Sequence, residues 1–141
     1  MYQTIRSKII EVINNNADKI AAAYRTDRSD ISAFPAALII PGALEASYHQ
    51  TSPGSNKEIY DFTIRVIYPF TEGQDTADIA LEQAIDELLT IFRDRKILGN
   101  AADWVVPVSV NPWGYMDRAG GTARVAELRI QAVRHIDPSN P

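Results

Sequence analysis

Apolar and polar side chains alternate most regularly in the stretch from Glu58 to Phe70. A period of two places successive side chains on opposite faces of a strand. The stretch therefore predicts a β-strand with one buried face. That face is formed by Tyr60, Phe62, Ile64, Val66, Tyr68 and Phe70.

The C-terminal part of the chain predicts two further strands, Trp104–Asn111 and Ala123–Ile136. In the second strand, apolar and polar residues again alternate. The connection Pro112–Gly121 is long and ends in a glycine pair, as the tip of a hairpin does. Residues 137–141 cannot continue a strand and are predicted to form a flexible tail.

The segment AFPAALIIPG, residues 33–42, is nearly all apolar and contains two prolines. It predicts a strand over Phe34–Ile40 that is buried on both faces. The Pro41-Gly42 pair predicts a turn after this strand. A more polar strand, Leu44–Thr51, is expected next, and it is followed by a hairpin tip around Ser52–Asn56.

Two segments carry the helical spacing of three and four residues between apolar positions. The first is Tyr2–Asn14, and its pattern can resume through Ala17, Ile20, Ala21 and Tyr24, which leaves its end open. The second runs from Asp75, a candidate N-cap, to about Lys96, and Gly99 is expected to end it. Its buried stripe is Leu81, Ile85, Leu88, Leu89 and Phe92.

These elements predict an α+β fold with the order α-β-β-β-α-β-β. A single, mostly antiparallel sheet of about five strands is expected, with the two helices packed on it. Residues 1–136 are predicted to form one domain, because a chain of 141 residues is long enough for one substantial core.

The composition excludes several classes of protein but does not by itself identify a function. The net charge is −4, so nothing favours specific nucleic-acid binding, which needs a concentrated basic surface. No cysteine is present, which excludes disulfides, thiolate metal sites and a cysteine nucleophile. No apolar run approaches the ~20 residues that cross a bilayer, and the start lacks a signal-peptide pattern, so a cytosolic protein without a membrane partner is expected.

Candidate catalytic chemistry is sparse. His49 and His135 each stand alone in a predicted strand, which is typical of strand-face residues and not of a metal site. No nucleophile elbow, phosphate loop or dinucleotide motif occurs. We therefore expect no enzyme, no catalytic or metal residues and no cofactor. A carboxylate site assembled from distant residues remains an alternative.

Several polar or aromatic residues in predicted loops are instead candidates for an interaction surface. They occupy the charged loop after residue 24, the hairpin tip near residue 56, the end of the second helix, and the connection after residue 112. Large side chains on an exposed tip favour a partner surface, although a loop folded back on the core explains them nearly as well. The candidates are Arg25, Asp27, Arg28, Asp30, Asn56, Arg93, Arg95, Lys96, Trp113, Tyr115, Met116 and Arg118.

The run from Phe34 to Gly42 and the later run Asp61–Phe70, DFTIRVIYPF, carry a family resemblance. Phe-Pro-Ala stands before a buried strand, and an aromatic strand ends in a Tyr-Pro step. With the leading amphipathic helix, the long second helix and the C-terminal hairpin, the chain resembles the tail-terminator proteins of long-tailed bacteriophages. The neck, or head–tail joining, proteins have a similar pattern.

The resemblance implies a structural virion protein that assembles in the host bacterial cytoplasm. In that family a homo-hexameric ring sits on the end of the tail tube, stops its polymerisation and offers a surface to the head-side connector or neck proteins. Such a ring needs a head-to-tail contact that closes by rotation. The alternative from a different class is a small monomeric binding module.

Overall fold

The computed structural model describes residues 1–47, 56–118 and 121–136. Its helices are α1 (Tyr2–Asn16) and α2 (Gln74–Phe92), with short 3-10 helices η1 (Phe70–Glu72) and η2 (Gly99–Ala101). Its strands are β1 (Ala22–Tyr24), β2 (Ala36–Ser47), β3 (Asn56–Pro69), β4 (Trp104–Arg118) and β5 (Gly121–Ile136). The α+β class and the order α-β-β-β-α-β-β are as predicted.

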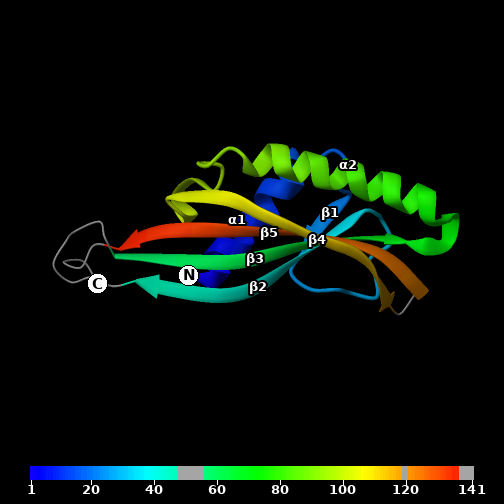
Figure 1. The fold of residues 1–141 in the computed structure, drawn as a ribbon, viewed down its shortest axis with the longest axis horizontal. Coiled ribbons are helices and arrows are strands. Elements are labelled where there is room, and N and C mark those ends of the chain that lie inside the picture. The colour runs from blue at the N-terminus through cyan, green and yellow to red at the C-terminus, as the bar shows by residue number, and fades with distance from the viewer. Residues whose placement is uncertain (48–55, 119–120, 137–141) are drawn as a thin grey trace.

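The five strands form one mixed, mostly antiparallel sheet in the order β1-β2-β3-β5-β4 (Figure 1). Only the short β1 runs parallel to its neighbour, pairing with β2 over three residues. The long strand β3 pairs along its whole length with β5, from Asn56↔Ile136 to Pro69↔Ala123. The two C-terminal strands thus form the expected hairpin, with β4 at the edge.

One face of the sheet is covered by both helices. The alternating residues of β3 from Tyr60 to Val66 and of β5 from Ala126 to Ala132 point into this core, as the sequence predicts. They pack against Ile5, Ile9, Val12 and Ile13 of α1 and against the buried side of α2. Burial of this apolar surface is the main stabilising contribution to the domain.

The opposite face carries a second, smaller cluster at one end of the sheet. Its buried members are Ile31, Ala36, Leu38, Ile67, Ala123 and Val125. The loop between β1 and β2 covers it, and Phe34 of that loop packs against it. The residues Ala36–Ile39 are all buried, alternately in the two clusters. The prediction that this segment is a strand buried on both faces is confirmed.

The predicted turn at Pro41-Gly42 is wrong. The chain continues through it as a single strand, β2, and the register with β3 shifts between Pro41 and Leu44 as in a β-bulge. Gly42 suits this bulge because a Cβ there would lie only 3.1 Å from both the Cβ and the carbonyl oxygen of Asp61. The two strands predicted on either side of the turn are therefore one.

Other boundaries also differ from the predictions. The helical pattern does not resume after α1, since residues 22–24 form β1. Helix α2 ends at Phe92, before the charged segment up to Lys96, and Gly73, not Asp75, occupies its N-cap position. Strand β4 continues to Arg118, so most of the predicted long connection is strand. The predicted tail 137–141 and most of the predicted hairpin tip lie outside the described residues.

Candidate interaction surfaces

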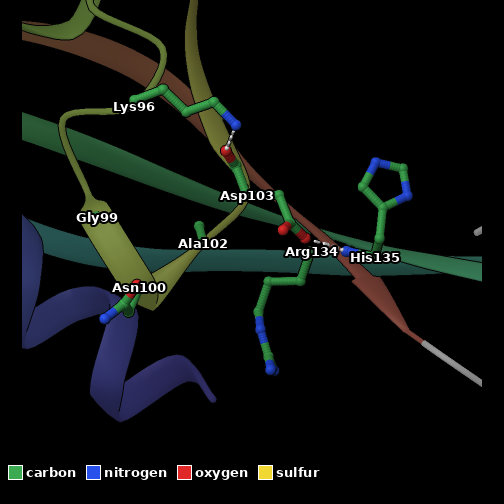
Figure 2. A pocket seen from close by; sticks show the side chains of 7 residues that line it. All are labelled: Lys96, Gly99, Asn100, Ala102, Asp103, Arg134 and His135. Carbon is green, nitrogen blue, oxygen red and sulfur yellow. Dashed lines mark hydrogen bonds between the residues drawn. The ribbon is translucent and has the colours of Figure 1, made fainter.

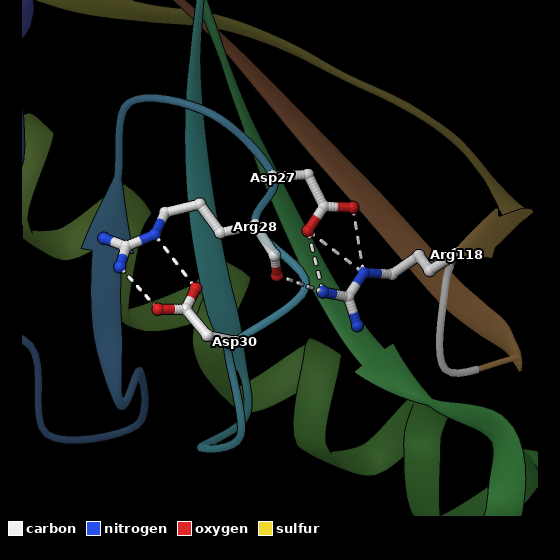
Figure 3. A network of polar contacts seen from close by, with 4 residues as sticks. All are labelled: Asp27, Arg28, Asp30 and Arg118. Carbon is white, nitrogen blue, oxygen red and sulfur yellow. Dashed lines mark hydrogen bonds and ion pairs between the residues drawn. The ribbon is translucent and has the colours of Figure 1, made fainter.

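The charged loop after β1 contacts Arg118 at the end of β4, a juxtaposition that local sequence patterns do not reveal (Figure 3). Arg118 donates from Nε and Nη2 to the Asp27 carboxylate at 2.9 and 2.7 Å, and from Nη2 to the carbonyl of Arg28 at 3.3 Å. Its guanidinium also lies 5.3 Å from the ring centroid of Phe34. Only 10% of the Arg118 side chain is exposed. These contacts fix the loop over the smaller core cluster.

The ion pair between Asp27 and Arg118 shifts the pKa of both groups. The hydrogen bond from Arg118 lowers the pKa of Asp27, and this outweighs the opposing effect of burial. The same hydrogen bond raises the pKa of Arg118. In the same loop Arg28 pairs with Asp30 at 2.6 Å, on the surface. Four of the predicted interface residues therefore pair with one another within the chain.

The three large candidate residues of the hairpin, Trp113, Tyr115 and Met116, differ in their contacts. Trp113 packs against the helix-covered core, and Met116 packs against the smaller cluster. Tyr115 is 54% exposed and makes an edge contact with Phe70, with ring centroids 5.5 Å apart. The guanidinium of Arg124 stacks over both Trp113 and Tyr115. Of the three, Tyr115 is the one that presents most of its side chain to solvent.

The segment after α2 is exposed, and it borders a polar cavity of about 460 Å³ (Figure 2). The Nζ of Lys96 donates to the carbonyl of Asp103 at 3.0 Å, and the Asp103 carboxylate accepts the backbone N–H of His135. The guanidinium of Arg95 stacks on Trp104 at 5.4 Å. Two of the side chains that line the cavity, Lys96 and Asp103, thus make hydrogen bonds that hold the segment between α2 and β4.

Asn56 lies at the start of β3 and is 3% exposed. Its position corrects the expectation of an exposed tip residue, since a buried side chain offers no surface to a partner. The predicted interface residues consequently fall into separate groups: the loop and hairpin tip around Arg118, the aromatic strand around Arg124, the segment after α2, and the buried Asn56.

Arg25, one of the predicted interface residues, lines a groove beside β2 together with Arg6, which the sequence did not single out. Arg6 of α1 donates from Nε to the carbonyl of Ile39 at 2.8 Å and from Nη2 to the carbonyl of Arg25. Arg25 donates to the hydroxyl of Ser7 at 3.2 Å. Burial and the charge of Arg25 lower the pKa of Arg6. Neither arginine forms an ion pair with a carboxylate in the described parts of the chain.

The exposed side of α2 carries an acidic stripe, Asp75, Ile79, Glu82 and Asp86, at spacings of four, three and four residues. Such spacings place the four side chains on one face of the helix. Ile79 is 48% exposed between the carboxylates. No ion pair of these carboxylates occurs with any residue that the structure describes. The stripe is therefore a surface of uncompensated negative charge with an apolar centre.

The edge strand β4 exposes Val108 and Val110, yet it is poorly suited to pair with another strand. Pro107 and Pro112 lack an amide hydrogen to donate. Register shifts also interrupt the strand between Pro107 and Ser109 and between Asn111 and Gly114. Prolines and bulges are the features by which natural sheets protect their edges. Contacts between side chains are therefore favoured over extension of the sheet at this edge.

Features of a catalytic or metal site are not found in the parts of the chain that the structure describes. No cluster of three or more metal-ligating side chains occurs there. In the described parts of the chain, the pKa of Asp27, of Asp30 and of Glu127 is lowered, whereas a general acid at neutral pH requires a raised pKa. Burial raises the pKa of Tyr60 to about 12, which leaves this phenol protonated. Among the described helices, none is long and apolar enough to cross a membrane.

No known protein-family model matches this chain, and no curated protein matches it either. The resemblance to tail terminators, based on the runs around Phe34 and Tyr68, therefore stays a prediction.

Proposed function

We propose that this protein is a structural subunit of a phage tail, a tail terminator that forms a homo-hexameric ring. In this role the ring sits on the last layer of the tail tube, stops its polymerisation and presents a surface to the head-side connector. The resemblance of the two sequence runs supports the family, and the fold is compatible with it.

The observation that carries the proposal is the difference between the two lateral sides of the sheet. The β2 side presents Arg6 and Arg25 beside an open strand edge. The α2 and β4 side presents the acidic stripe and a protected edge. A ring built by rotation needs two different and complementary surfaces on each subunit, because every contact is head to tail. A monomeric binding module needs no such pair of surfaces.

The rigid sheet supports the same role. Ion pairs cross it on the face away from the helices, including Arg65 to Glu127 at 2.7 Å and Arg129 to Asp61 at 3.1 Å. Burial alone would raise the pKa of Glu127, but hydrogen bonds from Asn111 and Arg65 and the charge of Arg65 together lower it. A sheet held in this way can keep surfaces at opposite edges in a fixed relation.

A neck or head–tail joining protein with the same lateral contacts is the second candidate.

Native mass spectrometry over a wide concentration range, with electron micrographs of the same sample, tests the ring. We expect a species of six times the subunit mass of 15.6 kDa and a closed ring in projection. A particle that remains monomeric at the highest concentration contradicts the proposal. To separate terminator from neck protein, the ring is added to polymerising tail-tube subunits, and only a terminator is expected to bind the tube end and limit its length.

A further inference from the structure

Arg6 and Arg25 form a cationic site with no carboxylate paired to it among the residues that the structure describes. The two side chains line a groove of about 460 Å³ together with Tyr2, Pro41 and Gly42. Burial lowers the pKa of Arg6, and repulsion by the charge of Arg25 lowers it further. Their described hydrogen bonds go to neutral groups, namely two carbonyls and a hydroxyl. A carboxylate in the groove would remove this repulsion and use the remaining guanidinium donors.

The acidic stripe of α2 lies on the other side of the molecule. Asp78, Glu82 and Asp86 follow one another at four-residue steps, so they share one flank of the helix. Asp78 on this flank pairs at 2.8 Å with Arg124 of β5, whose guanidinium stacks on β4 side chains. The opposite flank carries Glu87, which accepts the backbone N–H groups of residues 18 and 19 after α1. The stripe therefore leans toward β4 and away from α1.

We propose that the Arg6–Arg25 groove of one copy binds the acidic stripe of a second copy of this chain, head to tail. Glu82 or Asp86 supplies the carboxylate for the two arginines, and Ile79 covers the apolar wall formed by Tyr2 and Pro41. This contact rests on the proposed ring, because it specifies the surfaces that the ring would use between its subunits.

A second copy of the chain fits this site for two reasons. The groove and the stripe are complementary in charge, and both belong to the helix layer on the same face of the sheet. Two copies that keep the same face outward and stand side by side bring the α2 side of one next to the α1 side of the other. Because the two surfaces lie on opposite sides, a twofold pair cannot make both contacts at once, which favours a closed ring.

Charge reversal tests the contact. Arg25→Glu and Glu82→Lys each alter an exposed side chain, so the thermal unfolding midpoint of the monomer is expected to stay unchanged. Each variant is expected to weaken association by at least about tenfold, because like charges then face each other. The double variant Arg25→Glu/Glu82→Lys restores opposite charges and is expected to recover most of the association. Lys57→Glu, an exposed reversal on β3 away from the groove, is the control.

Cysteine cross-linking gives an independent test, because the chain has no cysteine of its own. Mixing the Arg25→Cys and Glu82→Cys variants under mild oxidation is expected to give a mixed dimer. Arg25→Cys mixed with Lys57→Cys is expected to give far less. The double variant Arg25→Cys/Glu82→Cys is expected to give a ladder of products up to the closed ring.

The outcomes separate the contact from the ring. Selective cross-linking, together with loss of association in the single variants and its recovery in the double variant, supports both the contact and the ring. A second outcome is that the parent forms rings, the single reversals assemble as well as Lys57→Glu, and the cross-link is not selective. In that case the proposed contact is wrong, but the proposed ring is still supported. If the parent never associates at any concentration, the ring and this contact are both overturned.

Discussion

Two helices cover one face of the sheet, whereas a single loop covers one end of the other face. On the helix side the core joins residues from both helices and all five strands, and its central side chains, such as Ile64 and Leu128, have no exposed surface. On the loop side the cluster is small, and the charged pair of Asp27 and Arg118 holds its cover in place. Stability is thus concentrated on one face, and the loop face depends on polar contacts.

The largest effect is expected from a charge on the helix-covered face. Ile64→Asp places a carboxylate at a position with 0% exposure, and burying an unpaired charge costs several kcal/mol, which is comparable with the whole stability of about 5–15 kcal/mol. We expect an unfolded chain by far-UV circular dichroism and one-dimensional NMR. The control is Thr63→Asp, on the opposite face beside Arg129, which is expected to remain folded. A folded Ile64→Asp variant contradicts the proposed difference between the faces.

A matched pair of truncations compares the two clusters directly. Leu128→Ala on the helix side and Leu38→Ala on the loop side remove the same atoms from positions with 0% and 3% exposure. Leu→Ala changes in cores cost about 2–5 kcal/mol, and the cost rises with the volume left empty. We expect Leu128→Ala near the upper end and Leu38→Ala near the lower end, because the loop can settle into the gap. Urea denaturation measures both, and equal losses would mean that the loop is as rigid as the helices.

The smallest effect is expected from the polar contact that holds the loop. Asp27→Asn removes the charge that Arg118 binds and is expected to lower the free energy of unfolding by about 1 kcal/mol at neutral pH. The folded pKa of Asp27 lies below the usual value of 3.8, so this contribution is complete above that pH. The stabilising contribution is lost as the pH falls through the lower pKa that Asp27 has in the folded protein.

Urea unfolding of the parent and of Asp27→Asn, followed from about pH 7 to about pH 2, measures this dependence. The two proteins are expected to differ at neutral pH and to converge in acid. A difference that stays constant across this range would show that the substitution acts through packing and not through the charge.

The long-period patterns of the sequence predict the fold class and the central strands. Residues that alternate over seven or more positions, as from Tyr60 to Val66, have one arrangement that buries them, so β3 and β5 form close to the predicted positions. Both helices also form, although α2 ends at Phe92, earlier than predicted. Short segments contain too few residues for their pattern to determine the secondary structure. Residues 22–24 are compatible with a helix or a strand, and only pairing with β2 decides in favour of β1. Pro41-Gly42 is typical of both a turn and a bulge.

The interaction surfaces were harder to predict, because their contacts join residues far apart in the chain. The candidates Asp27 and Arg118 are separated by 91 positions, and nothing local indicates that each is the other's partner. Arg6 lies in a helix whose sequence shows only an apolar stripe, and its proximity to Arg25 results from the parallel pairing of β1 with β2. The acidic positions of α2 were visible in the sequence, but not which of them would find partners.

The prolines and bulges of β4 also bear on how the chain behaves at high concentration. Edge strands that are long and flat are templates for amyloid-like growth, since each added chain creates the same edge again. Pro107, Pro112 and the two register shifts interrupt that template along the exposed half of β4. Concentrated subunits can therefore encounter one another repeatedly while fibrous aggregation is suppressed, and association is left to surfaces that recognise specific side chains.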